Sequence, residues 1–119
     1  MSLNKQPQRS DPEKWRYVRG TCRRYSISSH GRLRSNLYRQ RNSLGQIRYL
    51  KSKMLEPKPR ADGRDGLWAK IRIGYRVRQV NIGRLVATHF LYVPTGNPTL
   101  NHINGDKEDN NVSNLEWIR

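Results

Sequence analysis

Apolar and polar residues alternate in two parts of the chain, and each pattern predicts a β-hairpin. The first hairpin covers residues 25–35, with its turn at Ser29-His30-Gly31. Because side chains alternate between the two faces of a strand, Leu33 is expected in the core, while Arg32 and Arg34 face solvent or a ligand. Residues 15–18 form a further short strand before this hairpin.

The second hairpin is a two-stranded ribbon built from residues 67–73 and 75–82, with a tight turn at Gly74. Its basic residues are expected to share one polar face: Lys70, Arg72, Arg76 and Arg78. A basic ribbon of this kind can follow a phosphate backbone or enter the major groove of DNA. These four residues are therefore candidates for DNA binding, together with Arg32 and Arg34.

Residues 83–91 have apolar positions typical of a short helix packed on one face, with His89 among them as a hydrogen-bonded core histidine. The stretch between the two hairpins is the least regular part of the chain, although residues 44–50 are compatible with a strand. We therefore expect four segments: a flexible arm (1–13), a β-rich module (14–56), a basic loop (57–66), and a second module with the ribbon and the helix (67–119).

The charge is strongly basic and unevenly distributed. The 119 residues include 24 Lys and Arg against 9 Asp and Glu, which gives a formal net charge of +15. Residues 1–105 carry +17 of this, and residues 106–119 carry −2. A small domain needs a net charge of only about 2–8 for solubility, so the excess indicates a polyanionic partner, with nucleic acid ahead of an acidic membrane surface.

Other classes of protein fit the sequence poorly. The single cysteine, Cys22, excludes an internal disulfide and any zinc site with several cysteines. The mean hydropathy of −0.99 leaves no stretch near the roughly 20 apolar residues of a membrane span, so no membrane partner is expected. The first 15 residues lack the apolar core of a secretion signal.

Residues 99–118 have the most specific pattern in the chain. They read T-L-N-H-I-N-G-D-K-E-D-N-N-V-S-N-L-E-W-I. Oxygen and imidazole ligands, Asn101 and His102, stand at the end of a short strand. A turn rich in Asn and Gly follows, and residues 114–117 return as a second strand.

This segment resembles the HNH motif of phage and intron-type homing endonucleases, over roughly residues 80–119. A second resemblance precedes it, because W-R-Y-V-R-G and Y-S-I-S-S-H-G-R-L-R-S, within residues 15–35, are similar to the small module before the HNH region in those enzymes. The resemblance implies an α+β fold. In it, a small β-rich module precedes a ββα-metal (His-Me finger) module that lacks most or all of its C-terminal helix.

The resemblance also implies a chemistry and the residues that perform it. HNH enzymes hydrolyse phosphodiester bonds of DNA with a divalent metal, Mg²⁺ or Mn²⁺, and a strand histidine as general base. Carried over by position, His102 is the catalytic base, Asn101 is a metal ligand, and Asn114 stabilises the loop and holds the His102 backbone. The implied partner is duplex DNA, and the implied location is the cytoplasm of a phage-infected bacterium.

Two positions depart from the pattern of the resembling enzymes. Many of them have Asp where this chain has Asn101, and an amide oxygen binds a metal more weakly than a carboxylate does. Their helix after the N-L-E-W strand carries a third metal ligand, which would fall beyond Trp117. The carboxylates at positions 106, 108, 109 and 116 are candidates to replace this missing metal ligand. A second copy of the chain, in a homodimer, is another way to complete the metal site.

Three functions compete on this reading. The first is a metal-dependent endonuclease that nicks or cleaves duplex DNA. The second is a catalytically impaired DNA-binding remnant of such an enzyme, favoured by the missing helix ligand and opposed by the Asn101-His102 pair. The third is a basic RNA-binding or ribosome-associated protein, which explains the charge but leaves residues 99–118 unexplained.

Overall fold

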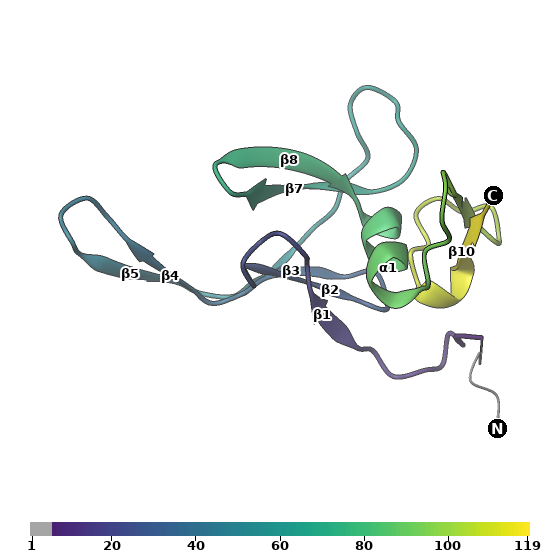
Figure 1. Cartoon of the computed structure of the whole chain (residues 1–119), viewed down its shortest axis with the longest axis horizontal. Coiled ribbons are helices and arrows are strands. Elements are labelled where there is room, and N and C mark those ends of the chain that lie inside the picture. Colours follow the sequence, from purple (N-terminus) through teal and green to yellow (C-terminus); the bar gives the residue numbers. More distant parts are fainter. Residues whose placement is uncertain (1–5) are drawn as a thin grey trace.

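The computed structural model describes residues 6–119, so the first five residues of the predicted arm lie outside it. The described chain has mixed strands and one α-helix, compatible with the predicted α+β class (Figure 1). Its elements are β1 (Trp15–Tyr17), β2 (Tyr25–Ser28), β3 (Leu33–Ser35), β4 (Tyr38–Arg41), β5 (Ile47–Leu50), β6 (Lys53–Leu55), β7 (Trp68–Ile73), β8 (Arg76–Asn81), α1 (Ile82–Phe90), β9 (Thr99–His102), the 3₁₀ turn η1 (Val112–Asn114) and β10 (Leu115–Ile118).

An antiparallel sheet in the order β1-β2-β3-β6 forms the N-terminal part, and its β2–β3 pair is the predicted first hairpin. The Ser28 hydroxyl accepts hydrogen bonds from the backbone N–H groups of His30 (3.1 Å) and Arg32 (3.0 Å), which closes the turn. Gly31 in this turn has φ +86°, a conformation that favours glycine. Leu33 is fully buried, as predicted.

Strands β4 and β6 were not expected from the sequence, and β5 lies within the stretch noted as a possible strand. The β4–β5 hairpin projects from the rest of the molecule, away from both termini (Figure 1). Its residues are mostly exposed, so neither face needs to be apolar and the alternating pattern is absent. The Asn42 carboxamide oxygen holds its turn by accepting from the backbone N–H groups of Leu44 and Gln46, both at 2.9 Å.

The β7–β8 ribbon has the predicted two strands and turn, but its four basic residues do not share one face. Residues directly opposite in an antiparallel pair point to the same side. Lys70 pairs with Gln79 and Arg72 with Val77, which puts these two basic residues on one face. Arg78 pairs with Ile71 and Arg76 with Ile73, which puts the other two on the opposite face. The prediction of one shared face was wrong because the two-residue turn fixes a register that places the two basic pairs out of phase.

Helix α1 follows β8 directly and matches the predicted helix to within one residue at each end. Asn81 is its N-cap, and the side-chain oxygen of Asn81 accepts from the backbone N–H of Arg84 at 3.0 Å. Ile82, Val86 and Ala87 are fully buried. The helix therefore presents one apolar side to the sheet of the N-terminal part.

One hydrophobic core joins the two predicted modules. Its buried residues are Val18, Tyr25, Ile27, Leu33, Ile71, Ile82, Val86, Ala87, Val112 and Leu115. Burying a side chain such as Ile27 contributes about 1.5–3 kcal/mol, so this shared cluster links the folding of residues 14–56 to that of residues 67–119. The N-terminal sheet, α1 and the C-terminal hairpin consequently form one packed body.

Hydrogen bonds between side chains and backbone groups also connect the N-terminal sheet to α1. His89 is buried in α1, where its Nδ1 donates to the Leu85 carbonyl (2.8 Å) and its Nε2 accepts from the Arg19 backbone N–H (3.0 Å). Arg16 of β1 donates to the His89 carbonyl at 2.9 Å. His89 is thus the hydrogen-bonded core histidine that the sequence indicates.

Residues 6–13 lie against the body, where the sequence predicts a flexible arm. Glu13 forms an ion pair with Arg32, and Arg9 forms one with Asp109. The Asp11 carbonyl is 3.0 Å from Nε2 of His30. Within the described range, α1 is the one α-helix, and it is too short to cross a membrane.

The environment of His89 predicts that acid destabilises the protein. Burial lowers the pKa of His89 below its ordinary value of 6.5, against the opposing hydrogen bond to Leu85. The unfolded chain therefore takes up this proton at a higher pH than the folded chain, and the free energy of unfolding falls as the pH drops below about 6.5. Thermal melts from about pH 7.5 to about pH 5 are expected to fall more steeply for the wild type than for His89→Gln, whose amide does not titrate. Parallel melting curves would contradict this.

Candidate active site

The segment with the HNH-like pattern folds as a β-hairpin. Strand β9 pairs antiparallel with β10, with His102 opposite Leu115 and Asn101 opposite Glu116. His102 and Leu115 face the core, whereas Asn101 and Glu116 lie on the other face. The two strands and the intervening turn are those that the sequence predicts.

Asn114 ties the turn of this hairpin together. Its Nδ2 donates to the Asn104 side-chain oxygen (3.0 Å) and to the Asp109 carbonyl (2.9 Å), and its Oδ1 accepts from the Asn104 backbone N–H (3.0 Å). Its carbonyl accepts from the Ile103 backbone N–H at 2.8 Å. These contacts reach residues 103, 104 and 109 rather than the His102 backbone, which the sequence analysis had assigned to Asn114.

His102 is 7% exposed, and its two ring nitrogens have different surroundings. Nε2 lies 2.9 Å from Oδ1 of Asn110, so it carries the proton when the imidazole is neutral. Nδ1 is buried and has no hydrogen-bond partner among the described protein atoms. A buried nitrogen without a partner costs about 1–3 kcal/mol, so this lone pair is a strong acceptor for a group that reaches it.

Asn101 and Glu116 form a polar pair on the exposed face of the hairpin. The Asn101 Nδ2 donates to a Glu116 carboxylate oxygen at 2.8 Å, which leaves the Asn101 amide oxygen free to bind a cation. Of the four candidate carboxylates, Glu116 is the one that contacts Asn101. Asp109 pairs with Arg9, and Asp106 accepts from the Glu108 backbone N–H.

This donor set fits a hard divalent cation with few protein ligands. Mg²⁺ binds oxygen atoms and commonly keeps several waters, with one or two carboxylates and the substrate phosphate completing its shell. Within residues 6–119, no three His, Cys, Asp or Glu side chains cluster to form a complete metal cage. Asn101 and Glu116 therefore fit a weakly held, substrate-completed ion better than a resident one.

A hollow of about 190 Å³ opens beside His102 at the N-terminal end of α1. The basic residues Arg84 and Lys107 line it, together with Asn81 and the acidic Asp65. A helix N-terminus favours anions, because its free N–H groups and its dipole point outward there. The hollow thus combines His102 with two cations and a helix end, the setting that a phosphate group needs.

The residues predicted for DNA binding lie on other surfaces, and none of the six lines this hollow. Arg34 stacks over the Trp15 ring with its guanidinium carbon 4.3 Å from the ring centre. Arg32 pairs with Glu13, and its hydrogen bonds lower the pKa of Glu13 to about 2. Part of the positive charge of Arg32 is therefore neutralised within the protein.

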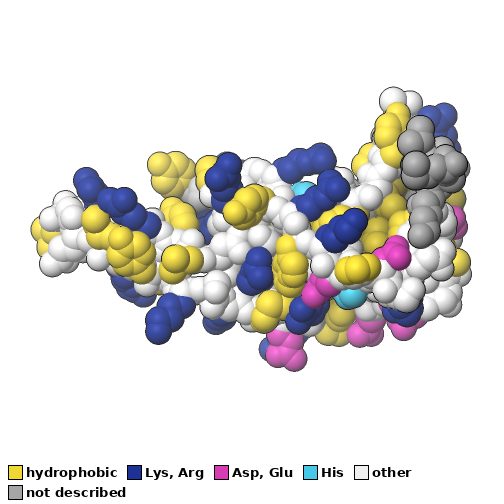
Figure 2. Space-filling model, turned by 90° about the horizontal axis from the view of Figure 1, so that it is seen from below, with side chains coloured by type: hydrophobic (Ala, Val, Ile, Leu, Met, Phe, Trp, Pro, Cys, Tyr) yellow, Lys and Arg dark blue, Asp and Glu magenta, His cyan; other side chains and the backbone are white. Residues whose placement is uncertain are grey.

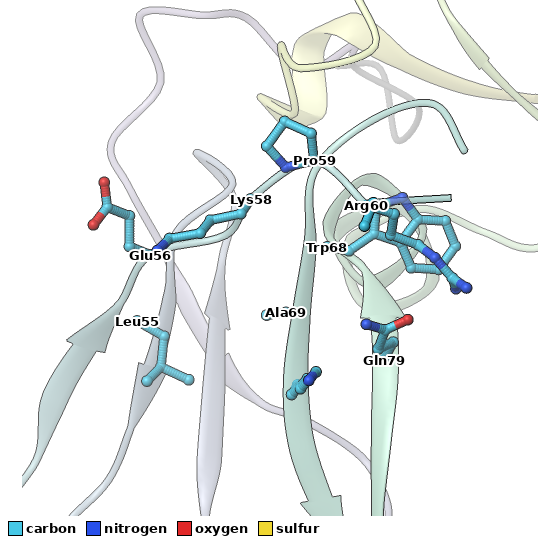
Figure 3. Close-up of a pocket in the computed structure, with 10 residues that line it drawn as sticks. Leu55, Glu56, Lys58, Pro59, Arg60, Trp68, Ala69 and Gln79 are labelled. Atoms are coloured by element: carbon cyan, nitrogen blue, oxygen red, sulfur yellow. The ribbon is translucent and has the colours of Figure 1, made fainter. Parts of the chain in front are cut away.

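Basic side chains are spread along the face shown in Figure 2, from the projecting hairpin to the body, whereas the acidic ones lie on the body. A second hollow, of about 350 Å³, lies between β6 and the ribbon (Figure 3). Lys58, Arg60 and Lys70 line it, and the Arg60 guanidinium stacks on Trp68 at 4.8 Å. It contains no histidine and only one carboxylate, Glu56, so it extends the basic surface rather than adding a second reaction centre.

Comparisons with known proteins agree with this geometry. No protein-family model matches the sequence. The chain is 39% identical, over 66 residues, to a protein of Acanthamoeba polyphaga mimivirus named as an uncharacterized HNH endonuclease, a match that covers 56% of this chain and 19% of that protein. It superposes on the HNH homing endonuclease I-HmuI, from a structure on DNA binding and cleavage, with a TM-score of 0.67 at 24% identity. The resemblance to HNH homing endonucleases is confirmed.

This chain matches only part of the length of each related protein. The superposition covers 88% of this chain and 52% of I-HmuI, and the chain spans about a fifth of the mimivirus protein. The predicted loss of most or all of the C-terminal helix is not confirmed by either comparison.

Three residues of the candidate site were missed or undervalued in the sequence. Asn110 was read as a turn former, although its side chain contacts His102. Gly83 had no assigned role, yet a Cβ there would lie 2.7 Å from Oδ1 of Asn110 and 3.1 Å from Nε2 of His102. The role of Asn110 was missed because two consecutive Asn residues indicate only a turn. The role of Gly83 was missed because its contacts arise from tertiary packing. Glu116 was noted only as one carboxylate among four.

The contact at Gly83 predicts an unusual response to alanine. In a helix, Gly→Ala normally stabilises by about 1 kcal/mol. Here the added methyl group would displace the Asn110–His102 pair, so Gly83→Ala should lower the free energy of unfolding by about 1–3 kcal/mol. Chemical denaturation measures this, with Thr88→Ala in the same helix as the control that should be neutral or stabilising. A Gly83→Ala protein more stable than the wild type would contradict the predicted clash.

Proposed function

We propose that this protein is a metal-dependent endonuclease acting on duplex DNA, with His102 as its general base. The observation that carries the proposal is the state of the imidazole, since Nε2 is held by Asn110 while Nδ1 has no partner. The mimivirus relative named as an HNH endonuclease and the HNH homing endonuclease with the same fold support it.

His102 is suited to accept a proton from the attacking water. A neutral imidazole with its proton on Nε2 presents the Nδ1 lone pair as the acceptor. Because Nε2 is hydrogen-bonded, the ring cannot readily turn to present its other nitrogen. The proton from the water would then lie on Nδ1 of an imidazolium still bonded to Asn110.

The scissile phosphate is proposed to lie across the carboxyl end of β9. There it can reach His102 from the hollow and Asn101 from the other face of the strand. Arg84 and Lys107, which line the hollow, would attract the phosphate and offset its negative charge, and the end of α1 adds to this. Asp65 also lines the hollow and offsets part of this positive charge.

Asn101 and Glu116 would hold the divalent ion through the amide oxygen and a carboxylate oxygen. When bound, Mg²⁺ or Mn²⁺ supplies a Lewis acid that stabilises charge on the phosphate and on the leaving oxygen. Glu116 also orients Asn101 through their hydrogen bond, so both side chains are positioned by the β9–β10 register.

The rest of the molecule is proposed to position the duplex. The basic surface would contact phosphates from the N-terminal sheet, through Arg32 and Arg34, and from the ribbon, through Lys70, Arg72, Arg76 and Arg78. A homodimer that adds ligands to the metal, and action in the cytoplasm of a bacterial host, belong to the same proposal.

A DNA-binding protein without catalysis is the second candidate. The lack of a cluster of three His, Cys, Asp or Glu side chains in the described residues favours it, because a weak metal site limits the reaction. It shares the basic surface with the nuclease, so affinity for DNA does not separate the two candidates.

Cleavage of supercoiled plasmid separates them. With Mg²⁺ or Mn²⁺ the wild type should convert supercoiled DNA to nicked or linear forms, and EDTA should stop this. His102→Ala should lower the rate by about 10²–10⁴-fold, the usual contribution of a general base, while duplex affinity in a gel shift stays the same. A wild type that binds duplex tightly and leaves the plasmid intact with either metal would favour the second candidate.

The register of the ribbon predicts unequal roles for its two basic pairs. The face with Lys70 and Arg72 also carries the exposed Val77 and Gln79 and borders the basic hollow beside β6, whereas Arg76 and Arg78 share their face with the buried Ile71. Lys70→Ala with Arg72→Ala should therefore reduce the salt dependence of duplex binding by about 0.9 in log–log slope per lost phosphate contact. Arg76→Ala with Arg78→Ala should reduce it less, and equal effects measured by fluorescence anisotropy would contradict this.

A further inference from the structure

We propose that Asn110 is the positioning residue for His102, and that the N-terminal sheet takes part in catalysis by holding Asn110 in place. The inference rests on the proposed function for its catalytic consequence. Asn110 would fix both the orientation of the imidazole and the nitrogen that carries its proton. Within the described residues, no other side chain bonds to the His102 ring.

The contact is well suited to select one tautomer. The Asn110 Oδ1 lies 2.9 Å from Nε2, in a site where His102 is 7% and Asn110 is 5% exposed. Because water has little access to either side chain, the alternative tautomer would leave the Asn110 oxygen facing a bare ring nitrogen. Two buried acceptors in contact are unfavourable, so the Nε2 proton is preferred while the Asn110 oxygen faces the ring. The Asn110 Nδ2 is buried without a partner, so a turned amide that donates to a bare Nε2 is the competing arrangement, and it would place the ring proton on Nδ1.

Two glycines from separate elements hold Asn110 between them. A Cβ at Gly31, in the β2–β3 turn, would lie 3.0 Å from both Cβ and the carbonyl oxygen of Asn110. A Cβ at Gly83, in α1, would lie 2.7 Å from Oδ1 on the other side. Only residues without a side chain allow this approach, so Asn110 is confined in both its backbone and its side chain.

A backbone hydrogen bond extends this contact to the next residues. The Val112 N–H donates to the Ser29 carbonyl at 2.8 Å, which ties the β2–β3 turn to the loop that carries Asn110. The N-terminal sheet is thus connected to the His102 ring by a series of contacts: the Ser29–Gly31 turn contacts the loop with Asn110, and Asn110 contacts His102. A module expected only to position DNA would also set the chemistry of the base.

The protonation of the His102 ring tests this without any cleavage assay. Long-range ¹H–¹⁵N correlation spectra of the labelled, metal-free protein at pH 8 distinguish a protonated from an unprotonated ring nitrogen, and His102→Gln assigns the signals. The wild type is expected to carry the proton on Nε2, and so is Asn110→Asp, which keeps an acceptor oxygen. Asn110→Leu should show a mixture of both tautomers.

Asn111 offers a matched control. It is adjacent, 6% exposed, and its side chain caps η1 by accepting from the Ser113 N–H at 3.0 Å rather than from the His102 ring. Asn111→Leu should lower the melting temperature and leave the His102 tautomer unchanged. A tautomer change confined to position 110 would separate positioning of the ring from general loss of loop structure.

Cleavage kinetics provide the second readout. Asn110→Leu should lower kcat by about 10–100-fold with little change in KM or in duplex affinity, and Asn110→Asp should recover most of the loss. If the wild type does not cleave DNA, the proposed function fails. The NMR measurement of the His102 tautomer then still tests whether Asn110 positions the ring. Wild-type His102 protonated on Nδ1, or an unchanged Nε2 proton in a folded Asn110→Leu protein, would overturn the inference.

Discussion

The close approach of three chain segments around Asn110 is the constraint on which the rest of the structure depends. The β2–β3 turn, the start of α1 and the loop before η1 meet at distances that leave no room for a Cβ at Gly83 and little room for one at Gly31. This contact sets how the N-terminal sheet lies against the helix and where the β9–β10 hairpin ends. The shared hydrophobic core then stabilises that arrangement, with Ile27, Val86 and Leu115 from three different elements.

The site divides its tasks between the two faces of one hairpin. Strand alternation sends His102 toward the core and Asn101 toward the exposed face, so neighbouring residues have opposite environments. Burial gives His102 a single fixed orientation, and exposure lets Asn101 and Glu116 meet a solvated cation. A phosphate at the end of β9 would be reached by both, so two adjacent residues would supply the proposed base and the proposed metal ligand.

Much of the fold could be predicted because it depends on local patterns. The alternation at residues 25–35 and the apolar spacing at 83–91 identified the central hairpin and α1, and the N-H-I-N-G motif identified the β9–β10 hairpin. The projecting β4–β5 hairpin has no buried face and gave no such signal. The faces of the ribbon were misassigned because register depends on the turn, and one residue of shift moves every side chain to the other side.

The site could be predicted only in part for a related reason. A motif names His102 and Asn101, but the groups that orient them come from tertiary contacts: Asn110 lies eight residues along the chain, and Glu116 lies across the hairpin. Gly83 and Gly31 contribute by having no side chain, which lets Asn110 pack against their backbones. A sequence motif does not reveal this kind of contact. The charge of +15 indicated a nucleic-acid partner but not which of several basic surfaces meets it.

A structure of the protein bound to duplex DNA, with Ca²⁺ in place of a catalytic metal, tests the central claim most directly. The account predicts a backbone phosphate at the carboxyl end of β9, within reach of Nδ1 of His102 and beside Arg84 and Lys107, with Asn101 and Glu116 on the metal. DNA bound only across the N-terminal sheet or the ribbon, with His102 far from any phosphate, would contradict it.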